Sequence, residues 1–209
     1  MRVVRSVNPS AYGASWYSAT RVAAPPRDRL NVELDVDVCV VGAGLAGLTV
    51  AREVAGRGCS VVVLEAQSVA WNASGRNTGF VLPGFAADAA ALVRRVGRDH
   101  ARALWSLSEA GAEYVREAAR GPSMQGIALS EGGWLHVSKT GDGEIRSEML
   151  TEELGATVEA WSAERVREAL RSPLYFGALH YPRGFSIHPL NYALGLAAAA
   201  EANGARIFE

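Results

Sequence analysis

The chain has 209 residues, enough for one ordinary domain, and its 21 Lys and Arg side chains nearly balance 22 Asp and Glu side chains. This balance, without a block of basic residues, predicts that nucleic acid is not a partner. The N-terminus lacks the apolar core of a signal peptide and no run of about 18 apolar residues predicts a membrane span, so we expect a cytoplasmic protein.

The two cysteines, Cys39 and Cys59, show neither a disulfide framework nor a metal-binding spacing. We therefore expect reduced thiols in the core, and the sequence predicts no metal site. No Ser/His/Asp arrangement or zinc-binding motif is present to indicate hydrolysis or metal chemistry.

Residues 1–34 contain Pro, Ser and Arg in a mixed pattern without a regular period. Such a composition predicts an irregular N-terminal arm that packs on the surface or on a neighbouring subunit. We expect three aromatic residues of the arm, Tyr12, Trp16 and Tyr17, to anchor it.

A strand followed by a glycine-rich turn comes next. Residues 36–41 are rich in β-branched side chains, as expected of a parallel strand covered on both faces. Gly42, Gly44 and Gly47 then form the pattern G-x-G-x-x-G. The first glycine allows a tight turn, the second lets the backbone approach a pyrophosphate, and the third lets the following helix pack close to the strand.

A helix is expected over 45–57, with its free N–H groups and positive dipole end directed at bound phosphates and Gly58 ending it. The second strand, 61–64, places Glu65 eighteen residues after Gly47, close to the roughly 20-residue offset at which an acidic side chain meets the adenosine ribose. A carboxylate there would repel a 2′-phosphate and disfavours NADP. The spacing predicts a dinucleotide-binding α/β fold and leaves NAD and FAD open.

The loop from Trp71 to Gly79 combines small residues, hydroxyl and amide groups, and the guanidinium of Arg76. Such a loop can wrap an extended cofactor and neutralise phosphate charge. The same residue types also form ordinary surface turns. Its position after Glu65 favours the cofactor interpretation.

The rest of the chain alternates helices and strands. The Ala, Leu and Val spacing predicts one or two long helices within 86–119, interrupted near Gly97. Pro189 suits the first turn of a helix, so the expected role of His188 is capping. The further elements are a strand at 133–138, a helix at 144–154, a strand at 157–161, a helix capped by Ser162, a strand at 174–181, a helix at 191–202 ended by Gly204, and a strand at 205–208.

These features together resemble a family, the D-amino-acid-oxidase-like (DAO) FAD-dependent oxidoreductases, and within it the gamma-glutamylputrescine oxidoreductase-like branch of amine oxidases. The resemblance rests on Ser15 to Thr20 followed by Pro25 and Pro26, the glycine pattern, Leu64-Glu65-Ala66, Ala73-Ser74-Gly75-Arg76-Asn77, Gly132 to Leu135, His188 to Leu190, and Gly204 to Ile207.

The resemblance implies FAD as the cofactor. It places the glycine turn along the pyrophosphate, Glu65 on the adenosine ribose, and residues 74–78 toward the ribityl chain and flavin ring. The expected cofactor-binding residues are Gly42, Gly44, Leu45, Ala46, Gly47, Glu65, Ala66, Ser74, Gly75, Arg76, Asn77 and Thr78.

The implied function is oxidation of the C–N bond of a small amine or amino acid by hydride transfer to flavin. Because the cofactor carries this chemistry, no acid or base need stand out, and the catalytic residues stay unassigned. Two alternatives remain: an NAD-dependent dehydrogenase, which the glycine pattern and Glu65 would serve equally, and a catalytically incompetent fragment that keeps a partial dinucleotide site.

The resemblance also implies a domain organisation. Family members are longer, so we expect an N-terminal portion of a longer enzyme, with a Rossmann-like FAD-binding βαβ unit and the beginning of an α+β substrate domain. The expected ranges are an arm at 1–34, an FAD-binding segment with following helices at 35–119, the start of a substrate domain at 120–188, and a helix and strand returning to the FAD domain at 189–209.

Overall fold

The computed structural model of the chain describes residues 12–140 and 143–209, with the side chains of all of these except 143–145. These residues form two compact units. The first unit contains the described residues up to Gly79 together with 118–128 and 187–209, and the second contains 80–117 and 129–186. In this part of the chain, no helix is both long and apolar enough to cross a membrane.

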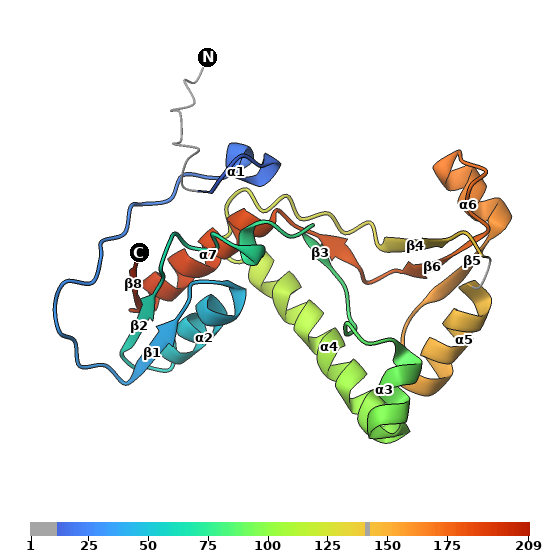
Figure 1. Cartoon of the computed structure of the whole chain (residues 1–209), viewed down its shortest axis with the longest axis horizontal. Helices are drawn as coiled ribbons and strands as arrows, with labels where there is room; N and C mark the ends of the chain where they lie inside the picture. The colour runs from blue at the N-terminus through green and yellow to red at the C-terminus, as the bar shows by residue number, and fades with distance from the viewer. Residues whose placement is uncertain (1–11, 141–142) are drawn as a thin grey trace, which may run out of the picture. The chain divides into compact units, whose positions relative to one another are not determined.

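The first unit is built on a parallel three-stranded sheet in the order β1-β2-β8. The strands are β1 (Val38–Val41), β2 (Val61–Leu64) and β8 (Arg206–Phe208). Helix α2 (Leu45–Ala55) joins β1 to β2, and α7 (Pro189–Ala202) leads into β8 and packs against α2 (Figure 1). This arrangement confirms the predicted Rossmann-like α/β fold and the return of the final strand to the sheet.

The apolar pattern of the sequence explains these elements. The β-branched side chains of β2 are buried from Val61 to Val63. Helix α2 buries Leu48, Ala51 and Ala55, which recur at helical spacing along one face. Helix α7 buries residues on nearly all sides, as expected for a helix that is apolar all round.

The expectation of a first strand covered on both faces is wrong for the described residues. Strand β1 lies at the edge of the sheet, its side chains alternate between half-buried and exposed, and Val41 is 86% exposed. Helix α2 packs on β1, whereas the side chain of Cys39 faces an open cavity of about 500 Å³. Cys39 and Cys59 are free and exposed, so the expectation that both lie in the core is wrong.

The second unit contains an antiparallel sheet in the order β4-β6-β5. Its strands are β4 (Trp134–Ser138), β5 (Glu159–Ser162) and β6 (Gly177–Tyr181), and a separate pair is formed by β3 (Phe80–Val81) and β7 (Phe185–Ser186). The helices are α3 (Ala89–Val96), α4 (Arg98–Ala119), α5 (Gly143–Leu154) and α6 (Ala163–Leu170) (Figure 1). Its core joins Ala101 and Trp105 of α4 with Leu150, Leu154, Ala156 and Leu179.

Several local predictions are confirmed. Gly97, with φ of 81°, separates α3 from α4, and the Ser162 side chain caps α6 by accepting a hydrogen bond from the Arg165 N–H at 3.3 Å. The boundaries of three helices differ from expectation. Helix α2 ends at Ala55 and is followed by a turn over 56–58, in which Gly58 has φ of 88°, while α5 starts at Gly143 and α7 at Pro189.

The units do not follow the expected domain ranges. Helices α3 and α4 were expected with the FAD-binding segment, but their apolar side chains pack in the core of the second unit. Residues 118–128 belong to the first unit, where the Ile127 carbonyl accepts a hydrogen bond from the His188 N–H at 2.6 Å. The functional roles given to these ranges remain predictions.

Candidate cofactor site

The glycine turn joins the carboxyl end of β1 to α2. Gly42 has φ of 98°, a conformation that favours glycine, and its N–H donates to the Leu64 carbonyl at 2.7 Å. A Cβ atom on Gly47 would collide with the carbonyl oxygen of Gly42. The helix thus packs against the turn as closely as the third glycine of the pattern predicts.

The N-terminus of α2 is suited to bind an anion. The first N–H groups of a helix have no partner within the helix, and the N-cap residue of α2, Gly44, has no side chain with which to accept them. The Leu45 N–H donates to Ser74 Oγ at 3.0 Å, and the first turn contains no acidic residue. Backbone N–H groups and the positive end of the helix dipole therefore face a position that a pyrophosphate can occupy.

Glu65 lies beside this turn at the end of β2. Its Oε2 atom accepts a hydrogen bond from the Ala43 N–H at 2.8 Å, and its Oε1 atom accepts one from the Gln67 N–H at 3.0 Å. A carboxylate has about four acceptor positions, so both oxygens retain capacity for ribose hydroxyl groups. Ala66, the next expected residue, is exposed.

The loop from 71 to 79 is held together by its own polar groups. It contains the short helix η2 (Ala73–Gly75). The Asn77 side chain donates to the carbonyls of Ala73 at 3.2 Å and Ser74 at 3.0 Å, and its Oδ1 atom accepts from the Gly79 N–H at 2.8 Å. Asn77 therefore stabilises the loop from within.

Gly75, one of the expected cofactor-binding residues, is closely packed within the protein. In the structure Gly75 is buried, and an added Cβ would collide with the Ala70 carbonyl and lie 3.0 Å from Leu190 Cδ1. The glycine is required for packing of the loop against α7.

The Arg76 guanidinium, expected near phosphate, is bonded to backbone carbonyls. Its Nε donates to the Trp71 carbonyl at 2.9 Å, and its Nη2 donates to the Tyr12 carbonyl at 3.0 Å. The guanidinium also lies 4.7 Å from the centre of the Trp71 ring. Close by, the Thr78 carbonyl accepts a hydrogen bond from the Tyr17 hydroxyl at 3.1 Å. Sequence reasoning missed both contacts with the arm, because each joins residues more than sixty positions apart.

The histidines have structural partners. His188 Nδ1 accepts the Asn191 N–H at 3.1 Å, which confirms its predicted capping role, and burial lowers the pKa of His188. His180 Nδ1 lies 3.1 Å from Glu159 Oε2, and this hydrogen bond lowers the pKa of Glu159. His136 makes an edge contact with Trp134, with ring centres 5.5 Å apart, and His100 Nδ1 lies 3.1 Å from the Val96 carbonyl.

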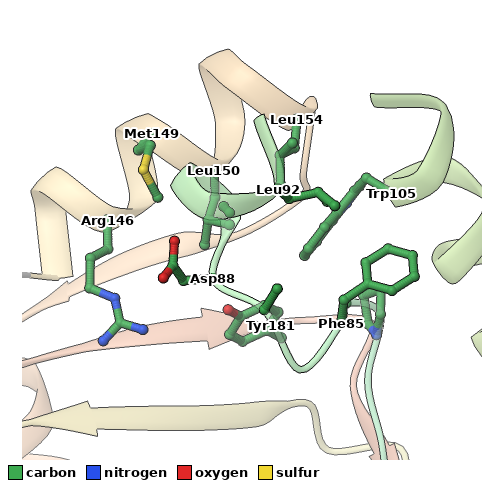
Figure 2. A pocket seen from close by; sticks show the side chains of 13 residues that line it. Phe85, Asp88, Leu92, Trp105, Arg146, Met149, Leu150, Leu154 and Tyr181 are labelled. Carbon is green, nitrogen blue, oxygen red and sulfur yellow. The ribbon is translucent and has the colours of Figure 1, made fainter. Parts of the chain in front are cut away.

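The second unit contains a cavity of about 200 Å³. Figure 2 shows Arg146, Asp88 and the Tyr181 hydroxyl toward one end of it, and Leu92, Trp105 and Phe85 toward the other. Burial raises the pKa of Tyr181, and the nearby charge of Arg146 opposes that shift. None of the expected cofactor residues lines this cavity, and within the described residues no cluster of His, Cys, Asp or Glu is arranged to hold a metal ion.

Comparison with known proteins decides the family. The profile described as "DAO: FAD dependent oxidoreductase" matches residues 37–209. The chain belongs to this family. The predicted resemblance and the predicted cofactor, FAD, are therefore confirmed.

Two curated relatives of this DAO chain are similar over most of its length. Gamma-glutamylputrescine oxidoreductase of Escherichia coli K12 is 34% identical over 199 residues, which are 94% of this chain and 46% of the relative. The probable oxidoreductase OrdL of Haemophilus influenzae is 33% identical over 183 residues, which are 83% of this chain and 41% of the relative. The chain thus spans less than half the length of these curated relatives.

Solved structures show the same fold. Glycine oxidase from Bacillus cereus superposes with a TM-score of 0.61 at 24% identity, covering 84% of this chain and 46% of that one. L-Amino acid deaminase from Proteus myxofaciens superposes with a TM-score of 0.62 at 18% identity, covering 90% and 41%.

The residues of the DAO chain fit FAD. The N-terminus of α2, which begins at Gly44 without an acidic residue in its first turn, is suited to its pyrophosphate, and the carboxylate of Glu65, which lies beside the same turn, is suited to its ribose. Outside Gly42 and its two chain neighbours, no protein atom lies within 4 Å of the position that a Cβ on Gly42 would take, so this side of the turn is open to a cofactor. The roles of the individual residues remain predictions.

Proposed function

We propose that the full-length protein is an FAD-dependent oxidoreductase that oxidises the C–N bond of a small amine or amino acid. The observation that carries this proposal is the hydrogen bond from the Ala43 N–H to Glu65, which holds this carboxylate beside the glycine-capped N-terminus of α2 in a chain of the DAO family. The relatives include gamma-glutamylputrescine oxidoreductase, glycine oxidase and L-amino acid deaminase, and their names support an amine or amino acid as the substrate.

The proposed roles of the first unit follow its geometry. The backbone of Gly42, Gly44, Leu45 and Ala46 lies along the pyrophosphate, and Gly47 allows α2 to approach the turn. Ser74 Oγ accepts the Leu45 N–H and so holds the loop against the same turn. FAD, when bound, supplies the acceptor for the hydride that leaves the carbon bearing the nitrogen.

Selectivity for FAD over a 2′-phosphorylated dinucleotide follows from Glu65. Its carboxylate accepts hydrogen bonds from ribose hydroxyls, and a phosphate at the same place would meet a like charge. The other expected residues contribute to FAD binding through the backbone of the segments that border the cofactor. They are Ala66, Gly75, Asn77 and Thr78.

The test is to purify the full-length protein and mix it without oxygen with candidate substrates. We expect a bound flavin whose absorbance is bleached by an amine or amino acid from a panel containing gamma-glutamylputrescine, glycine, L-proline and other amino acids. The matched controls are hydroxy acids of the same carbon skeleton. Bleaching by the hydroxy acids alone, or purification with NAD in place of flavin, would overturn the proposal.

A further inference from the structure

The N-terminal arm is fastened to the first unit at three places along its length. In Figure 1 it runs as a long blue segment from α1 (Trp16–Thr20) to β1. Helix α1 begins with a capping box. Ser15 Oγ accepts the Ser18 N–H at 3.0 Å, and Ser18 Oγ accepts the Ser15 N–H at 3.0 Å. The aromatic residues contribute unequally, since Tyr12 and Tyr17 are half-buried while Trp16 is 74% exposed and does not anchor the arm as expected.

The first fastening is to the loop from 71 to 79. Arg76 donates to the carbonyls of Trp71 in the loop and Tyr12 in the arm, so one planar guanidinium bridges the two segments. The Tyr17 hydroxyl adds a second bond to the Thr78 carbonyl at 3.1 Å. Two contacts of the arm therefore end on the loop that borders the proposed cofactor site.

The second fastening is to the start of α7. The Val22 N–H donates to Asn191 Oδ1 at 2.9 Å, while the buried Asn191 amide donates to the Gly126 carbonyl at 2.7 Å. Thr20 Oγ1 lies 3.0 Å from His188 Nε2. Releasing the arm would leave the buried Oδ1 atom of Asn191 without the Val22 N–H as its donor, and an unsatisfied buried acceptor has a free-energy cost.

The third fastening is near the end of the described chain. The buried Arg27 side chain makes a bidentate pair with Glu201, with N–O distances of 2.8 and 3.0 Å. The Glu209 N–H donates to the Asp28 carbonyl at 3.1 Å, and Glu209 Oε1 accepts the Val69 N–H at 2.8 Å. These contacts hold the arm at Arg27 and Asp28, and the contacts with the loop hold it at Tyr12 and Tyr17, so residues 12–28 are held at both ends.

We infer that residues 12–28 form a strap that holds the loop from 71 to 79 in its cofactor-binding conformation. In this arrangement Arg76 is not a phosphate ligand; it is a positioning residue that joins the strap to the loop. This inference rests on the proposed function of the loop. Tyr12 is half-buried, and this burial raises the pKa of its phenol.

The strap has a clear physical effect. A loop made of Asn, Ser and Gly loses conformational freedom when it is ordered around a ligand, and this loss weakens binding. A loop already held by the strap has less freedom left to lose. FAD affinity should therefore depend on contacts that lie between arm and loop and that do not touch FAD.

The decisive variants in the full-length protein are Arg76→Lys and Tyr17→Phe. Lysine keeps the positive charge that a phosphate would need but loses the planar fork that bridges two carbonyls. Phenylalanine removes only the hydroxyl that bonds Thr78. Arg57→Lys is the matched control, because Arg57 is exposed in the same unit.

Two measurements are needed: the Kd for FAD of the reconstituted apoprotein, and the rate at which trypsin cleaves the arm after Arg21 in apoprotein without FAD. We expect Arg76→Lys to raise the Kd about tenfold and Tyr17→Phe a few-fold, with cleavage accelerated in both and unchanged in the control.

The alternative outcome is distinct. If Arg76 is a phosphate ligand, Arg76→Lys changes affinity only modestly, Tyr17→Phe changes nothing, and neither alters cleavage of the arm; that result would overturn the strap. The cleavage measurement needs no cofactor, so it separates this inference from the proposed function. A wild-type protein that binds no FAD would overturn the proposed function, while accelerated cleavage in the two variants would still support the fastening of arm to loop.

Discussion

Glu65 Oε2 accepts a hydrogen bond from the Ala43 N–H at 2.8 Å, so the carboxylate at the end of β2 is attached to the middle of the glycine turn. The bond holds the side chain at the carboxyl edge of the parallel sheet, where dinucleotides bind in this class of fold. The same carboxylate can then order the turn and receive a ribose.

The first prediction is that removing the charge of Glu65 weakens FAD binding. Glu65→Gln should raise the Kd for FAD in the full-length protein about tenfold, because charge-assisted hydrogen bonds become neutral ones, and Glu65→Ala should raise it further. Glu168→Gln, on an exposed position of α6, is the control. Unchanged affinity in both Glu65 variants would place the ribose elsewhere.

The second prediction contrasts two glycines. Gly75→Ala should lower the free energy of unfolding of the apoprotein by about 1–3 kcal/mol, because the new Cβ collides with the Ala70 carbonyl. Gly44→Ala should have a smaller effect on stability and a larger one on FAD affinity, since its Cβ would lie 3.0 Å from Ser74 Oγ beside the helix N-terminus. Urea unfolding and FAD titration of both variants provide the comparison, and a Gly75→Ala protein of wild-type stability would contradict it.

The third prediction concerns the core of the second unit. Leu179 on β6 is 1% exposed and belongs to the core cluster, so Leu179→Ala should lower the free energy of unfolding by about 2–5 kcal/mol. Leu107→Ala is the matched control, because Leu107 is 66% exposed, and it should stay within about 0.5 kcal/mol of wild type. Similar losses in the two variants would argue against this core.

The fourth prediction is a pH dependence that arises from His188. Burial lowers its pKa in the folded protein, so the unfolded chain takes up a proton first as pH falls. Protonation of Nδ1 would also remove the acceptor of the Asn191 N–H. The contribution of His188 is therefore fully present above its unfolded pKa of about 6.5 and is lost as pH falls from there toward the lower folded pKa.

The variant His188→Asn keeps a capping side chain but cannot titrate. Its stability should change less than that of wild type between about pH 7 and pH 5.5, measured by urea unfolding at each pH. Parallel curves for the two proteins would show that His188 does not contribute to the pH dependence.

The sequence by itself determined the features that depend on neighbours along the chain. The spacing of Gly42, Gly44 and Gly47, the β-branched run of β2, and the caps at Ser162 and His188 each involve hydrogen bonds or steric limits within a few residues. Such local requirements can be recognised directly in the order of residues.

Only the tertiary structure decided the features that depend on distant segments. The guanidinium of Arg76 bonds Tyr12, Gly75 packs against Leu190, α4 joins the core of Leu179, and one face of β1 remains open. A donor binds whichever acceptor the fold brings within reach, and a side chain is buried only if another element covers it. The pattern along the chain specifies what each residue can do, and the packing of remote segments selects which partner it has.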